Sequence, residues 1–131
     1  MVTTYDAKDV SVIVNGIYLT GFADGTFVSY SKDEEQFNVV VGALGDTARA
    51  KINNPLGTIT VTLQQTSPQV QMMNNLAISG KLVEVRIIHK GSNTQKVGGT
   101  QCFVKKPADG EYGSEISNRE FEIAVLDYDI N

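Results

Sequence analysis

The chain of 131 residues has no tryptophan, one cysteine and one histidine. A single cysteine excludes an internal disulfide and fits a protein made in a reducing cytoplasm. One histidine and one cysteine cannot supply the three or four ligands of a zinc site. We expect His89 to be a structural residue at the rim of a strand and Cys102 to be a buried, inert thiol. The sequence therefore predicts no catalytic, metal or cofactor site, and we expect a protein that is not an enzyme.

Long apolar runs and an excess of basic residues are also missing. No segment approaches the ~18 consecutive apolar residues needed to cross a bilayer, and the first residues lack the pattern of a secretory signal. The 11 Lys and Arg face 15 Asp and Glu, for a net charge of −4. Tight binding of nucleic acid needs clustered cations, so it is not expected. We interpret the acidic run Asp33–Glu35 as a solvated surface.

What the sequence does contain is alternation of apolar and polar residues. This pattern is typical of strands with two unlike faces, and it recurs in about eight segments. So many strands in one small domain predict a mainly β fold, a sandwich or barrel of two packed antiparallel sheets over residues 1–131. The expected strands cover residues 10–14, 17–20, 26–30, 37–41, 58–63, 81–90, 100–105 and 120–128.

One helix is expected among the strands, at about 68–79, flanking the sheets. Ser67 is a suitable N-cap, and Pro68 would occupy the first helical position, where its missing N–H costs nothing. Gly80 would end the helix. The helical spacing of apolar residues predicts one stripe that packs on a sheet, formed by Val70, Met73, Leu76 and Ala77.

Residues 42–57 separate two predicted strands and form a connection about three times longer than an ordinary hairpin loop. Long loops in compact domains are usually functional or disordered, and this one carries charges and paired asparagines but no catalytic set. We therefore expect an arm that reaches another subunit. The predicted inter-subunit contacts are Asp46, Arg49, Lys51, Asn53 and Asn54.

The strand at 58–63 has one hydroxyl face, made by Thr58, Thr60 and Thr62, that is suited to line a lumen or face solvent. Small sheets with long strands expose their edges, which is a liability in a monomer. Joining the sheets of several copies into a ring removes these edges, and head-to-tail stacking of rings gives an open tube.

The order and spacing of several short segments resemble the tail tube proteins of contractile-tailed bacteriophages. These segments are Val10–Gly16, Thr20–Gly25, Val41–Asp46 with Arg49, Thr60–Pro68, Val104–Pro107 and Gly113–Phe121. The resemblance implies two packed antiparallel sheets with a flanking helix. It also implies hexameric rings, stacked around a channel that holds the tape-measure protein and then DNA, and a helix on the outer side of the sheets.

The resemblance further implies the partners and the location. The partners are other copies of the chain, a tail sheath, a baseplate or initiator and a tape-measure protein, with DNA passing through the lumen without specific binding. The location is the virion tail, assembled in the host bacterial cytoplasm. A tube of a pyocin or type VI-like injection system is an alternative. A small-ligand- or carbohydrate-binding β-domain is another, although such sites usually present aromatic side chains and this chain has no tryptophan.

Overall fold

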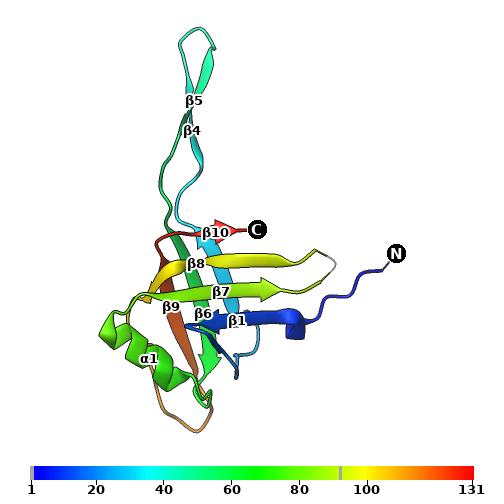
Figure 1. The fold of residues 1–131 in the computed structure, drawn as a ribbon, viewed down its shortest axis with the longest axis vertical. Helices are drawn as coiled ribbons and strands as arrows, with labels where there is room; N and C mark the ends of the chain where they lie inside the picture. The colour runs from blue at the N-terminus through cyan, green and yellow to red at the C-terminus, as the bar shows by residue number, and fades with distance from the viewer. Residues whose placement is uncertain (1, 92) are drawn as a thin grey trace.

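The computed structural model describes residues 2–91 and 93–131. Met1 and Ser92 fall within the expected single domain but lie outside the described residues. The described residues form two antiparallel sheets and one α-helix, which confirms the predicted mainly β class (Figure 1). The elements are η1 (Ala7–Asp9), β1 (Val10–Val14), β2 (Ile17–Tyr18), β3 (Val28–Lys32), β4 (Phe37–Val41), β5 (Thr47–Lys51), β6 (Gly57–Gln64), α1 (Val70–Ser79), β7 (Val83–His89), β8 (Gln95–Val104), β9 (Asn118–Val125) and β10 (Asp129–Ile130).

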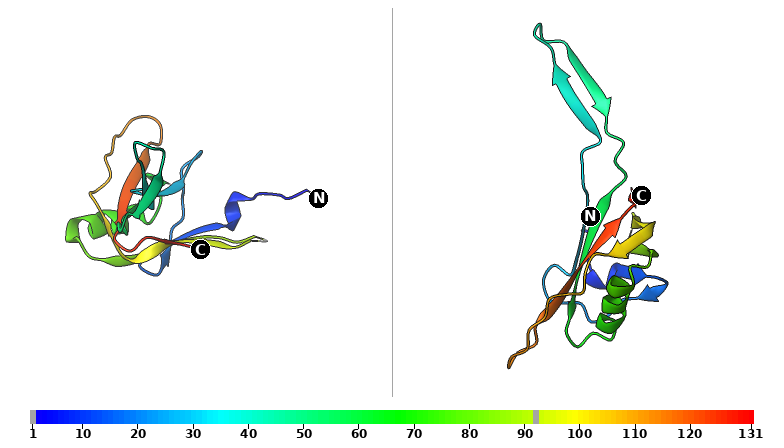
Figure 2. Two further views of the ribbon diagram at one scale, coloured as in Figure 1. Left: turned by 90° about the horizontal axis from the view of Figure 1, so that it is seen from above. Right: turned by 90° about the vertical axis from the view of Figure 1, so that its left-hand side faces the viewer.

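The larger sheet forms the body of the molecule. Its strand order is β2-β1-β7-β8-β9-β6-β3, and β10 pairs with β8. The strands β1, β7 and β8 run across the direction of β6 and β9, so the two halves of the sheet turn toward one another (Figures 1 and 2). The sheet is not closed into a barrel, because its order begins at β2 and ends at β3.

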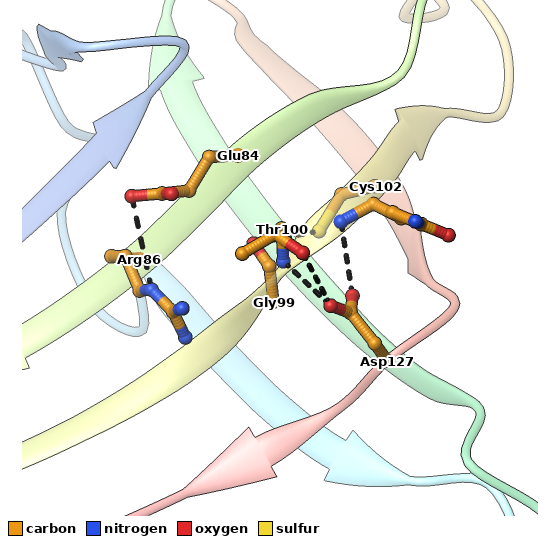
Figure 3. A network of polar contacts seen from close by, with 7 residues as sticks. Glu84, Arg86, Gly99, Thr100, Cys102 and Asp127 are labelled. Carbon is orange, nitrogen blue, oxygen red and sulfur yellow. Dashed lines mark hydrogen bonds and ion pairs between the residues drawn. The ribbon is translucent and has the colours of Figure 1, made fainter.

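A bend in β8 makes this crossing possible. Gly98 has a φ of 148°, and a Cβ there would lie 2.0 Å from the carbonyl oxygen of Val85, so only glycine fits. Beyond the bend, the Asp127 carboxylate accepts hydrogen bonds from the backbone N–H groups of Thr100 and Gln101, each at 3.0 Å (Figure 3). These contacts satisfy donors that a straight ladder would have paired.

Both halves of the sheet contribute to a single core. The apolar positions of β6 and β9 alternate with exposed or half-buried ones, as expected for strands with one buried face. The register places Ile59 opposite Ile123 and Val61 opposite Phe121, and all four side chains are completely buried. The helix α1 closes the core with Met73, which is also completely buried.

The start of α1 differs from the prediction. The helix begins at Val70, and Gln69 is the N-cap without a side-chain capping bond, so the assignments of Ser67 as N-cap and Pro68 as first helical residue are wrong. Ser67 is buried, and its hydroxyl donates to the carbonyl oxygen of Thr20 at 2.6 Å. The same hydroxyl accepts from the N–H of Gln69 at 3.4 Å, so Ser67 closes the turn that precedes the helix while it also bonds to the body. At the other end, Gly80 is the C-cap in the left-handed conformation.

The segment 42–57 also differs from the irregular loop that we expected. Its first residues form a tight turn, and residues 47–51 form the strand β5, which pairs with β4 from Phe37↔Lys51 to Val41↔Thr47. We call this hairpin, residues 37–51, the arm. It projects from the body beyond the start of β6 and forms the second sheet (Figures 1 and 2).

Candidate assembly surfaces

The arm is exposed along its whole length. Every residue of β4 and β5 is exposed, including the consecutive Val39, Val40 and Val41 at 66%, 58% and 65%. Leu44 in the turn at the tip is 93% exposed. An isolated two-stranded hairpin is at best marginally stable in water, and adjacent exposed apolar residues mark a surface that another molecule covers.

The predicted contact residues are spread along the arm. Asp46 lies in the turn, where its carbonyl oxygen accepts from Gly42 N–H at 2.7 Å. Arg49 stacks on Phe37, with the guanidinium carbon 4.1 Å from the ring centroid. Lys51 is exposed on β5 opposite Phe37. Among the described residues, none of these three charged side chains forms an ion pair, so all of them are available to a partner.

The two predicted asparagines lie in the connection between the arm and β6. Asn54 serves its own loop, because its Oδ1 accepts from the Leu56 N–H at 3.0 Å. Asn53 is exposed beside Asn54 on the same connection, and the N–H of Ile52, just before it, donates to the carbonyl oxygen of Gln36. The first of these bonds shapes the connection, and the second extends the hairpin ladder by one position beyond the pair Phe37↔Lys51.

The three predicted threonines do share one face of β6. Thr58, Thr60 and Thr62 are half-buried on the side opposite the core. Across the register they meet Glu120 and Glu122 of β9, so this face is polar and acidic. Lys105 offsets one of these carboxylates by an ion pair of 2.7 Å with Glu122. Such a face is hydrated and is not adhesive toward phosphates.

The same half of the sheet ends in an open edge. In the described residues β3 pairs with β6 on one side only. Its three central residues, Ser29, Tyr30 and Ser31, are exposed. The start of β9 is open as well, because β8 pairs only with residues 123–125. Unpaired strand edges are templates for pairing with a second chain.

The two residues with reactive side chains lie apart. Cys102 is completely buried, and burial raises its pKa to about 11, so the thiol is unreactive near neutral pH. His89 lies at the end of β7 and contacts the ring of Tyr5, with centroids 5.8 Å apart. Within residues 2–91 and 93–131, no group of three metal-ligating side chains is assembled. In the same part of the chain, no helix has the length and apolarity to cross a bilayer.

One charged residue that the sequence analysis did not single out is buried. Arg119 is only 6% exposed and lies at the end of the body opposite the arm, where it pairs with Leu63. Its position in β9 has the same parity as the buried Phe121, Ile123 and Val125. An arginine at an apolar parity position was the signal that could have identified it.

Comparisons with solved structures place this architecture among tail and injection particles. The chain is similar to the "anti-feeding prophage cap (AFP tube terminating cap)", with a TM-score of 0.63 and 12% identity over 100% of this chain and 94% of that one. It is similar to the "sheath/tube terminator" of an extracellular contractile injection system, PVC, with a TM-score of 0.65 and 10% identity over 98% and 97%. It is also similar to a chain from the virion of a native gene transfer agent particle, with a TM-score of 0.61 and 13% identity over 93% of this chain and 94% of that one.

At these identities the likeness defines the fold alone. A comparison with curated protein sequences found no match. The family model described as "Bacteriophage PhiTE tail tube protein" matches residues 3–124, nearly the whole chain. The chain therefore belongs to the family of bacteriophage PhiTE tail tube proteins. It is a structural protein of a phage-type tail and not an enzyme.

Proposed function

We propose that this chain assembles into hexameric rings that stack into the inner tube of a phage tail, the conduit for DNA ejection. The exposed arm carries this proposal. It leaves one end of the body, presents uncovered valines and charges, and gains no core by folding in a single copy. A hairpin of this kind is stabilised when a neighbouring copy covers it.

Ring formation follows from the open edges of the body sheet. The free edge of β3 and the open start of β9 lie on opposite sides of the β9-β6-β3 half. Pairing the edge of one copy with the opposite edge of the next would continue the sheet around a ring and cover both of these edges. The threonine face would then line the channel, with Glu120 and Glu122 beside it.

The charge of the ring suits passage of DNA. Six copies with a net charge of −4 each carry about −24, and the acidic part of it on the threonine face would repel the phosphate backbone from the wall. The electrostatic potential of the lumen in an assembled structure tests this point. A neutral or basic channel wall would overturn it.

The partners follow from the same role. We expect a tail sheath outside the tube, a baseplate or initiator at one end and a tape-measure protein in the lumen before DNA, in a virion assembled in the host cytoplasm. The tube of a phage-derived contractile injection system is the alternative. It is favoured by the similarity to chains from two such particles.

Negative-stain microscopy of the purified chain at increasing concentration tests assembly. We expect rings or hollow tubes, and a strict monomer at all concentrations would contradict the proposal. Arg49→Glu tests the arm separately, since it reverses a charge that is unpaired within one copy. This variant should retain rings and shorten or abolish tubes, whereas Lys81→Glu, the same charge change at an exposed position outside the arm, should not.

A further inference from the structure

A pocket lies at the end of the body opposite the arm. It has a volume of about 370 Å³ and is bounded by the β6–α1 connection, the first turn of α1, and the side chains of Tyr112 and Arg119. The strand register shows where the pocket lies. Arg119 pairs with Leu63 near the end of β6, whereas the arm precedes Gly57, the first residue of β6.

The guanidinium of Arg119 has no anionic partner in this pocket. It donates to the hydroxyl of Ser117 and to the backbone carbonyl oxygens of Asn118 and Glu111, at 3.2 and 3.3 Å. The ring of Tyr112 lies 5.4 Å from its carbon. No carboxylate of the described residues approaches it within 4.0 Å. A charge that is 94% buried is normally compensated by an opposite charge, and here every contact is neutral.

A second positive feature faces the same pocket. The helix α1 has no side-chain capping bond at Gln69 and no acidic residue in its first turn. The N–H groups of Gln69 and Val70 donate to the hydroxyl and carbonyl oxygens of Ser67, but no negative charge offsets the positive end of the helix dipole. Gln71, in that first turn, lines the pocket together with Arg119. Two independent positive features that meet at one pocket define a site for an anion.

We propose that this pocket binds a carboxylate of a second copy of the chain, supplied by Glu34 or Glu35. This inference rests on the proposed stacking. Copies stacked head to tail bring the start of β6 in one copy against the end of β6 in the next. Lys32 pairs with Gly57 at that start, and the run Asp33–Glu35 follows directly.

Within this run, the two glutamates are the free members. Asp33 already accepts a hydrogen bond of 2.8 Å from the hydroxyl of Thr58. Glu34 and Glu35 are exposed and form no ion pair among the described residues. The other candidate, Asp46, lies at the arm tip, which projects well past this junction (Figure 1). The acidic run, which in a single copy is only a solvated surface, thereby acquires a partner.

Cross-linking tests the contact directly. One population of the protein carries Glu35→Cys, and another carries Tyr112→Cys at the mouth of the pocket, where Tyr112 is 91% exposed. The two populations are mixed, assembled and oxidised gently. Cys102 is buried in both and does not compete. We expect a disulfide-linked dimer only in the mixture. A second mixture combines Leu44→Cys, at the arm tip, with Tyr112→Cys. If this mixture forms the dimer and the mixture with Glu35→Cys does not, the pocket receives the arm tip and the proposal is overturned.

Neutralising variants test the charge. The double variant Glu34→Gln/Glu35→Gln leaves the pocket and its fold untouched, and it should raise the protein concentration needed for stacking by about 30-fold or more. Arg119→Gln should do the same, and thermal unfolding of the unassembled variant checks that it still folds. Asp109→Asn is the matched control, because it neutralises an exposed carboxylate whose ion pair is with the exposed Lys106 of its own copy. Tubes that form at an unchanged concentration in both variants overturn the pocket assignment and leave the proposed function intact. Absence of rings and tubes in the unmodified chain overturns the proposed function itself.

Discussion

Removing the Asp127 carboxylate should loosen the bend of β8 and lower the stability of the unassembled copy. The carboxylate accepts three hydrogen bonds, from the N–H of Thr100 at 3.0 Å, its hydroxyl at 2.6 Å and the N–H of Gln101 at 3.0 Å. Asp127 is half-buried, so water reaches part of the site and each lost bond costs less than in a dry core. We estimate a loss of about 2 kcal/mol for Asp127→Ala and about 1 kcal/mol for Asp127→Asn.

Thermal unfolding followed by circular dichroism measures this loss. For a chain of this size, 2 kcal/mol corresponds to a decrease in Tm of about 8 °C. Asp129→Ala, an exposed carboxylate two residues further on, is the matched control and should leave Tm unchanged. If Asp127→Ala has the same Tm as the unmodified chain, the glycines and the core alone hold the bend, and the reasoning is refuted.

The same carboxylate gives the effect a pH dependence. Burial acts to raise the pKa of Asp127, but the hydrogen bonds from Thr100 and Gln101 outweigh it and hold the pKa below its ordinary value. A folded pKa below the unfolded value of about 3.9 means that the stabilisation is present above that pH and is lost as the pH falls through the folded pKa. The Tm difference between Asp127→Asn and the unmodified chain should therefore be constant near neutrality and shrink below about pH 4.

Three further outcomes are expected. Gly98→Ala should leave little folded protein in a solubility and circular dichroism assay, since its Cβ would lie 2.0 Å from a backbone oxygen, while Gly113→Ala has open space and should be neutral. Cys102, with its pKa raised to about 11, should react with a thiol reagent only after denaturation. In the unassembled copy, amides of the arm (residues 37–51) should exchange with solvent far faster than those of β6 (57–64), and equal protection would contradict a hairpin stabilised by its neighbours.

The core strands could be predicted because burial imposes a pattern on them. Residues 58–63 alternate since one face of β6 packs on the core and the other carries the threonines. The strand β5 could not be found in this way. Its residues Thr47–Lys51 are all exposed and pair only with β4, so no core demands alternation. The first half of β8 was missed as well, because Gly98 and Gly99 have low strand propensity and are retained there for the bend.

The assembly surfaces were only partly predictable, for a related reason. The charges of residues 42–57 predict a contact surface, and the structure adds that Asp46, Arg49 and Lys51 are exposed on a hairpin; the contact itself stays a prediction. The helix start was placed too early because residues 67–69 form a turn before α1, in which the Ser67 hydroxyl accepts from the N–H of Gln69 and donates to the carbonyl oxygen of Thr20. Arg119 can be interpreted only in three dimensions. Its burial and the missing counter-charge are properties of the fold around it, and neither is encoded by local spacing.

The polarity of the body explains why assembly of this chain should be open-ended along one direction. The arm and the acidic run lie at the start of β6, and the Arg119 pocket lies at its end. The two surfaces of the proposed contact, the acidic run and the Arg119 pocket, therefore lie at opposite ends of the body. When two copies make this contact, one copy still has a free acidic run and the other still has a free pocket. A heterologous contact of this kind continues as a stack rather than closing as a dimer. In the proposed assembly the edges of β3 and β9 would close each ring around the axis, while every copy in the stack would present the same two surfaces along it. The length of such a stack would then have to be set by another component.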